Sequence, residues 1–271
     1  MKMKIFLYFL LVISAFPACT KKDNSEFTDT PIVESYLNPG DYLNLHVSRQ
    51  LPFSSGVQYS SDDIDNLTIK VTNGNNLFTL TPLGDGKYID SSLIVKEGES
   101  YSLSFKYNLR NVTAVTNIPP KPTNFTQSVK AIYVDRMSSS SRPPSGGMGT
   151  MPEPVILKWD NYNESYYIVI IENMESNLDP IRDFGDTTPP GNMFRKSPTT
   201  SSGLELRPQE FQYFGRHRII LYHVLPDYAS LYSDNSTSSQ NLTNPSTSIM
   251  NGYGIFTGLN ADTLYLNVHE N

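Results

Sequence analysis

Cysteine is almost absent from this sequence, because Cys19 is the only one among 271 residues. A single thiol excludes any disulfide within the chain, so a domain in an oxidising compartment has to be held together by its apolar core. Hydrophobic residues make up 38% of the chain, and they include 17 Tyr and 13 Phe. The chain is therefore long and apolar enough for one large domain or two ordinary ones without covalent cross-links.

Basic residues are also few. The sequence has 21 Lys and Arg against 27 Asp and Glu, which gives a formal net charge of −6. The basic residues form no cluster, whereas binding to phosphate backbones requires clustered Lys and Arg. We therefore expect no nucleic acid among the partners of this protein.

Long apolar runs are missing except at residues 5–16, and this run is shorter than the ~20 residues of a membrane-spanning helix. Lys2 and Lys4 come before the run, and Ala18 lies directly before Cys19. This order of basic, apolar and small residues is typical of a secretory signal. We predict a lipoprotein signal peptide at residues 1–18 and a lipidated tether at residues 19–30, with the lipid on Cys19. The alternative is an incidental cysteine near a signal that is cut elsewhere.

Acyl chains on Cys19 would hold the protein at a bilayer, since each buried CH₂ contributes roughly 0.8 kcal/mol. Lys21 and Lys22, followed by Asp23 and Glu26, resemble the surface-export signal of Bacteroidota lipoproteins. We therefore predict an outer-membrane protein that is anchored by lipid and faces the cell surface. The alternative for this charged stretch is a solvated tether with no export role.

Sustained helical periodicity is absent after the signal, and strands with alternating apolar and polar residues take its place. In the first half, the turn sequences Asn73-Gly74 and Gly84-Asp85-Gly86 separate such strands. The alternating apolar positions include Leu43, Leu45, Val47, Tyr101, Leu103, Phe105 and Tyr107. Six or seven strands at short spacing predict an immunoglobulin-like β-sandwich at residues 31–118.

Prolines end this sheet and predict a stiff linker at residues 119–123. Beyond it, Trp159 ends an alternating strand, and residues 166–172 are apolar on both faces, as in a central strand. Further strands are expected at residues 218–225, 255–257 and 264–268, with a short helix capped by Asp227. We predict a fibronectin type III-like β-sandwich at residues 124–271. The expected fold class is thus all-β, with two tandem β-sandwich domains.

Several short motifs resemble a known family. They are Asn244-Pro245 with residues 249–256 near the C-terminus, residues 31–37 and 45–49 near the start, and residues 84–88 and 98–103 between them. They are similar to a Bacteroidota outer-membrane lipoprotein family that is labelled only as a domain of unknown function. Genes of that family often lie beside those of TonB-dependent transporters. The resemblance implies an accessory role at the cell surface, and it brings no catalytic residues.

Groups typical of catalysis or metal binding are missing from the sequence. There is no Gly-x-Ser-x-Gly motif, and the only cysteine is expected to carry lipid. His217 and His223 lie on one predicted strand about 20 Å apart at ~3.3 Å per residue, which is too far for one ion. We expect no enzymatic activity, no cofactor and no metal site. The alternative is a soft copper site in the insert at residues 137–154, formed by Met137, Met148 and Met151.

Loops offer the better candidates for binding. The connection at residues 174–203 is longer than the roughly 12–15 residues above which a loop is usually functional or disordered. Loops at the ends of a β-sandwich present recognition residues on a rigid scaffold. The candidate ligand-binding residues are Arg182, Asp183, Phe184, Asp186, Arg195, Tyr213 and Phe214. The alternative is that these aromatic residues only pack the second core.

These features predict a non-catalytic outer-membrane lipoprotein exposed at the cell surface. It would bind a small-molecule or oligomeric nutrient for a TonB-dependent transporter, or cap that transporter. Two other functions compete with this one, namely a structural or adhesive cell-surface protein and a copper-handling lipoprotein.

Overall fold

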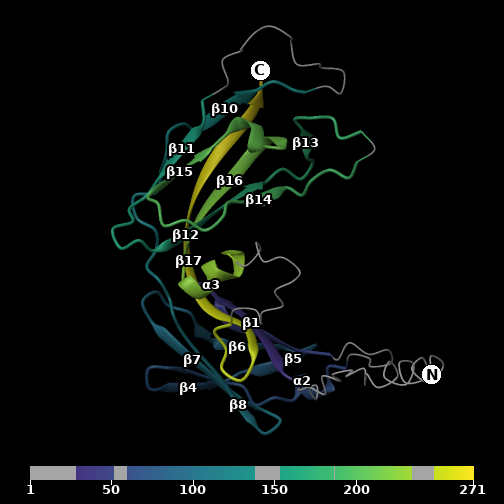
Figure 1. Ribbon diagram of the computed structural model, residues 1–271, viewed down its shortest axis with the longest axis vertical. Helices are drawn as coiled ribbons and strands as arrows, with labels where there is room; N and C mark the ends of the chain where they lie inside the picture. The colour runs from purple at the N-terminus through teal and green to yellow at the C-terminus, as the bar shows by residue number, and fades with distance from the viewer. Residues whose placement is uncertain (1–28, 52–59, 138–152, 186, 234–246) are drawn as a thin grey trace, which may run out of the picture.

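The computed structural model describes residues 29–51, 60–137, 153–185, 187–233 and 247–271. This part of the chain is all-β, and its strands form two stacked sandwiches joined at a narrow waist (Figure 1). The predicted fold class is therefore confirmed, while the immunoglobulin-like and fibronectin-like types stay predictions. The helices in the described residues are too short and too polar to cross a lipid bilayer.

The first sandwich has one sheet in the order β5-β6-β2-β1-β17 and a second in the order β4-β3-β7-β8. Its core contains the alternating residues of both sheets, among them Leu45 and Val47 of β2 and Tyr101 and Leu103 of β7. The bounds of its strands are β1 (Pro31–Leu37), β2 (Tyr42–Arg49), β3 (Lys70–Asn73), β4 (Asn76–Thr79), β5 (Thr81–Gly84), β6 (Lys87–Ile94), β7 (Ser100–Tyr107) and β8 (Arg110–Asn117).

The β5–β6 turn shows why glycine is needed there. Gly84, Asp85 and Gly86 all have positive φ, and a Cβ atom on Gly86 would overlap the carbonyl oxygen of Val47. The short helix α2 (Asp62–Asp65) lies beside this turn, and the Asp65 carboxylate accepts the Gly86 N–H at 2.5 Å. This hydrogen bond lowers the pKa of Asp65, so Asp65 supports a turn.

The second sandwich has one sheet in the order β14-β12-β16-β17, with β10 also paired to β17, and a second sheet in the order β15-β11-β9. Trp159 lies in the core between them, next to Phe125 and Tyr167. The bounds are β9 (Thr126–Gln127), β10 (Ala131–Val134), β11 (Val155–Lys158), β12 (Tyr166–Asn173), β13 (Asp179–Pro180), β14 (Met193–Arg195), β15 (Gly203–Leu206), η1 (Pro208–Glu210), β16 (Tyr213–Val224), α3 (Pro226–Ser233) and β17 (Tyr253–Glu270).

Strand β12 is buried on both faces, as the sequence predicted. Val169 and Ile171 face the second core, whereas Ile168 belongs to a small cluster on the opposite face. Helix α3 covers that outer face through Ala229, Tyr228 and Tyr232. The helix forms where expected, but Asp227 is its second residue and not its cap. The Asp227 carboxylate accepts the hydroxyl of Thr257 at 3.0 Å and thereby attaches α3 to β17.

Strand β17 is shared by both sandwiches, which differs from the two separate strands expected at residues 255–257 and 264–268. Its first part pairs parallel with β1, from Ile32↔Tyr253 to Leu37↔Gly258. Its second part pairs antiparallel with β16, from Val224↔Leu259 to Gly215↔Val268. The division at residues 119–123 separates two cores, but Ile249 and Phe256 pack in the first core although they follow the second in sequence.

The sequence predicted two strands and not one because Asn260 interrupts the apolar pattern of β17. Asn260 is buried where β17 passes from one sandwich to the other. Its amide donates to the carbonyl oxygen of Pro119 and to Glu97 Oε2, both at 3.0 Å. The polar break in the pattern is therefore a buried contact with the linker, and the strand continues through it.

Candidate functional site

The described candidates for ligand binding lie in three places, namely at residues 182–184, on β14 and at the start of β16. Arg182 and Phe184 lie near the end of the second sandwich, where the Phe184 ring is 6.4 Å from that of Tyr213. The Asp183 carboxylate accepts the Gly185 N–H at 2.9 Å and so belongs to a turn. Arg195 lies on β14 and stacks on Tyr232 of α3, with its Cζ atom 3.8 Å from the ring centroid.

Other predicted positions lie outside the described residues. These are the signal peptide at residues 1–18, nearly all of the tether, and the side chains of Cys19, Met148, Met151 and Asp186. Tyr213 and Phe214 are described and buried. Phe214 therefore packs in the second core. Tyr213 lines a groove that is described below.

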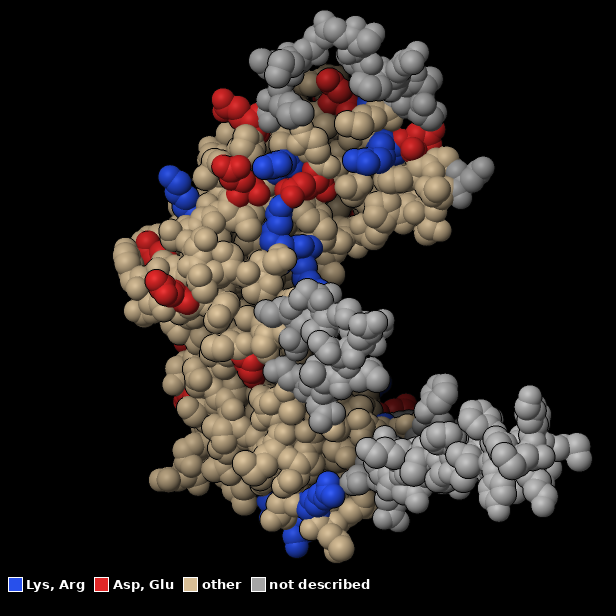
Figure 2. Space-filling view, viewed as in Figure 1, with Lys and Arg blue, Asp and Glu red and all other residues tan. Residues whose placement is uncertain are grey.

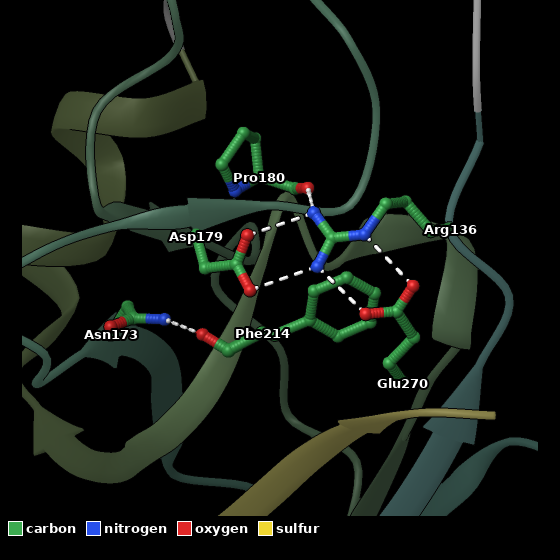
Figure 3. A network of polar contacts seen from close by, with 6 residues as sticks. All are labelled: Arg136, Asn173, Asp179, Pro180, Phe214 and Glu270. Carbon is green, nitrogen blue, oxygen red and sulfur yellow. Dashed lines mark hydrogen bonds and ion pairs between the residues drawn. The ribbon is translucent and has the colours of Figure 1, made fainter.

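Sequence reasoning missed Arg136, which joins three separate segments (Figure 3). Its guanidinium donates two hydrogen bonds to Asp179 at 2.8 and 2.9 Å and two to Glu270 at 2.9 and 2.8 Å. A fifth goes to the Pro180 carbonyl oxygen at 2.9 Å, so all five N–H donors are used. The Phe214 ring lies 4.7 Å from Cζ. Since its partners are distant in sequence, no local pattern could reveal this network, which we call the Arg136 clamp.

The Arg136 clamp continues into backbone hydrogen bonds between two chain segments. Directly after it, the Met137 N–H donates to the Ile181 carbonyl oxygen at 2.8 Å, and the Asp183 N–H donates to the Met137 carbonyl oxygen at 3.2 Å. Met137 and the segment carrying Arg182 and Phe184 are therefore held together next to the clamp. Arg136 is a positioning residue for this end of the molecule.

The clamp predicts a dependence of stability on acid. Hydrogen bonds from Arg136 lower the pKa of Asp179 and of Glu270. Because these pKa values are lowered, the stabilisation is present above the ordinary carboxyl pKa of about 4 and is lost as pH falls through the lower folded values. We expect the melting temperature of wild type to fall more steeply between pH 5 and pH 3 than that of Arg136→Gln, as measured by differential scanning calorimetry.

The matched control for this prediction is Arg110→Gln, which removes an exposed arginine at the β7–β8 turn. This variant should follow the wild-type pH profile. Equal acid sensitivity of wild type and Arg136→Gln would show that the two carboxylates do not act through Arg136.

A groove runs beside β14, the outermost strand of its sheet. It has a volume of about 480 Å³ and contains two of the predicted residues, Arg195 and Tyr213. We call it the β14 groove, and its lining consists of Pro190, Gly191, Asn192, Met193, Phe194, Arg195, Lys196, Glu210, Gln212, Tyr213 and His217. It combines aromatic rings, amides and charged groups, the mixture typical of small-molecule sites.

The inner end of the β14 groove is a buried polar network. Nδ1 of His217 lies 3.1 Å from the Gly215 carbonyl oxygen, which can only accept, so Nδ1 carries the proton. Nε2 then accepts from the Asn173 amide at 3.3 Å, and that amide also donates to the Phe214 carbonyl oxygen at 2.8 Å. Burial lowers the pKa of His217, so the ring is neutral at pH 7.

The remaining groups of the β14 groove are also held by partners. Lys196 forms an ion pair with Glu210, and the Tyr213 hydroxyl donates to the Pro190 carbonyl oxygen. These contacts fix residues 190–196 against η1 and β16. The groove is therefore a preformed site that can hold a ligand through ring faces, amides and one ion pair.

The two histidines of β16 do not approach one another. His217 belongs to the β14 groove, whereas His223 stacks on Tyr167 at 4.8 Å and bonds the Pro120 carbonyl oxygen through Nδ1 at 2.8 Å. Within the described ranges, no three His, Cys, Asp or Glu side chains are grouped so that they could hold a metal ion.

Comparison with known proteins gives one relationship. A search of curated proteins found no match. A family model described as a domain of unknown function (DUF4249) matches residues 20–264. This match covers nearly the whole chain and includes both sandwiches, so the protein belongs to the DUF4249 family.

Proposed function

We propose that this protein is a lipid-anchored, surface-exposed component of the outer membrane that binds a nutrient ligand for, or caps, a TonB-dependent transporter. The β14 groove is the observation that carries the proposal, because it is a preformed site at the edge of the sandwich that carries the long loops. The residue order before Cys19 supports lipid anchoring, and the family resemblance of the sequence supports the transporter as partner.

The position of the β14 groove suits a binding role. It lies at the open edge of the second sandwich, and its walls are held by the Lys196–Glu210 ion pair and by hydrogen bonds of Tyr213 and Asn192. A site with walls fixed before binding loses little conformational entropy when a ligand enters. The function proposed here is therefore capture of a ligand without chemical change.

The partner is tested by affinity purification from solubilised outer membrane, with a tag placed after the exposed residue Asn271. We expect a TonB-dependent transporter to be enriched over an unrelated tagged lipoprotein. Recovery of intact, membrane-bound protein with no transporter enriched would contradict the proposed partnership.

The β14 groove is tested by Gly191→Trp. Gly191 has no atom within 4 Å of a Cβ placed on it and no positive φ, so the indole can fill the groove without backbone strain. Binding is measured by fluorescence on an array of oligosaccharides and peptides. For every array member that wild type binds, we expect the signal of Gly191→Trp to be at least tenfold weaker. Gly191→Ala is the matched control and should bind as wild type does. If Gly191→Trp keeps the wild-type binding pattern, the groove is not the ligand site.

A further inference from the structure

Three arginines share the outer face of the sheet that contains β14. Arg195 is opposite Ile170 of β12. On β16, Arg218 is opposite Tyr265 of β17, and Arg216, two residues earlier, is opposite Asn267. Cross-strand partners project to the same side, and this side is opposite to the one that Ile219 and Leu221 bury in the second core. We call it the arginine face.

The second sandwich carries a row of basic side chains on the face seen in Figure 2, with acidic side chains beside the upper ones. At ~4.8 Å between strands and ~3.3 Å per residue, the Cα atoms of Arg195 and Arg216 are roughly 16 Å apart. Arg195 also lines the β14 groove, so the groove and the arginine face are continuous.

Two of these guanidiniums are oriented by tyrosine rings and have no acidic partner. Arg216 lies over Tyr265, with Cζ 4.3 Å from the ring centroid. Arg195 stacks on Tyr232 and donates one hydrogen bond to its hydroxyl at 2.8 Å. No ion pair among the described residues includes either arginine. Stacking fixes the plane of a guanidinium while its N–H edge stays available for a planar anion.

The third arginine shows how a carboxylate is bound on this face. Arg218 donates to Glu172 Oε2 from Nε at 2.9 Å and from Nη2 at 2.5 Å. Its charge is therefore already matched. The Glu175 carboxylate accepts the backbone N–H of Arg216 at 2.9 Å but forms no ion pair with its guanidinium. Arg195 and Arg216 are thus the two arginines of this face whose guanidiniums form no ion pair among the described residues.

Exposed aromatic rings continue the arginine face beyond Arg216. Tyr265 is 44% exposed and Tyr133 is 58% exposed. Tyr133 lies beside His269 with ring centroids 5.4 Å apart, and these two residues are cross-strand partners on β10 and β17. Partly exposed rings beside guanidiniums suit a ligand that has apolar faces and carries anions at intervals.

We propose that the arginine face binds an acidic oligosaccharide, with the carboxylates of its sugar units on Arg195 and Arg216 and its sugar rings against the exposed tyrosines. The guanidinium fork matches a carboxylate in geometry and charge, and the tyrosines supply stacking surface at low entropic cost. This inference rests on the proposed function for its biological role and names the ligand class, but the binding itself requires no transporter.

The test is isothermal titration calorimetry of the full chain in detergent with oligogalacturonate, compared with a neutral malto-oligosaccharide of equal length. We expect binding of the acidic oligosaccharide alone, with affinity that falls as salt rises. Arg216→Gln and Arg195→Gln should each weaken it about tenfold, the range for one charge-assisted hydrogen-bonded contact. Arg110→Gln, far away at the β7–β8 turn, should leave affinity within twofold.

Four outcomes would overturn the inference. They are no binding of oligogalacturonate, equal binding of the neutral oligosaccharide, equal binding of a polyglutamate peptide, and unchanged affinity in both arginine variants with wild-type melting temperatures. Competition by inorganic phosphate at equal concentration would be a fifth such outcome, because it would show a general anion site. Because purification of the transporter partner is a separate experiment, failure of the ligand class and failure of the proposed function are distinguishable.

Discussion

Phe256→Ala is expected to lower the stability of both sandwiches, although Phe256 lies only in the first core. The side chain is completely buried, and truncating such a phenylalanine costs about 3–5 kcal/mol. Trp159, the only tryptophan, lies in the second core, so its fluorescence reports on the other sandwich. Because β17 runs through both, we expect the Trp159 transition and the far-UV circular dichroism transition to move together to lower urea concentration.

The control for Phe256→Ala is Leu109→Ala, at a fully exposed position in the β7–β8 turn. It should leave both transitions unchanged. The decisive measurement compares the Trp159 fluorescence transition of Phe256→Ala with its circular dichroism transition. A circular dichroism transition that shifts while the Trp159 transition stays in place would show that the sandwiches unfold independently, and the shared strand would then not couple them.

Gly254→Val should be at least as damaging. Gly254 has φ of +95° and pairs with Val33 of β1. A Cβ atom at this position would overlap the Val33 carbonyl oxygen and lie 3.0 Å from its nitrogen. The left-handed conformation alone costs a non-glycine residue roughly 1–2 kcal/mol, and β1 also has to move away. We expect a loss of more than about 3 kcal/mol in the free energy of unfolding, measured by urea titration.

Gly191→Ala again provides the control, because it adds the same Cβ atom where there is room and no positive φ. It should unfold within about 0.5 kcal/mol of wild type, as is usual for surface substitutions. If Gly254→Val unfolds within 1 kcal/mol of wild type, the parallel β1–β17 pairing is not needed for stability.

Much of the fold could be predicted from local pattern alone. A strand was predicted from the alternating apolar residues Tyr101, Leu103, Phe105 and Tyr107. The prediction holds because one face of the sheet is buried, and all four side chains lie in the first core. The turn at Gly84-Asp85-Gly86 was predictable because consecutive positive φ angles favour glycine. These features depend only on neighbours in sequence, which is why the all-β class followed from them.

Features that depend on distant neighbours were not predictable. The buried Asn260 reads as a break in a strand, since nothing local shows that the Pro119 carbonyl oxygen and Glu97 meet its amide. The Arg136 clamp was missed for the same reason. Among the predicted site residues, Arg195 and Tyr213 line one groove, whereas Phe214 lies under Arg136. Sequence spacing cannot separate a ring that packs a core from one that lines a groove.

The placement of β17 also bears on when the chain can fold during synthesis. Residues leave the ribosome in order from the N-terminus, yet β1 and β16 both need β17 as their neighbour. Neither sheet can close until the residues from Tyr253 onward have emerged, so both sandwiches remain incomplete through most of translation. Emergence of this one strand therefore sets the earliest moment at which either sandwich can reach its native pairing.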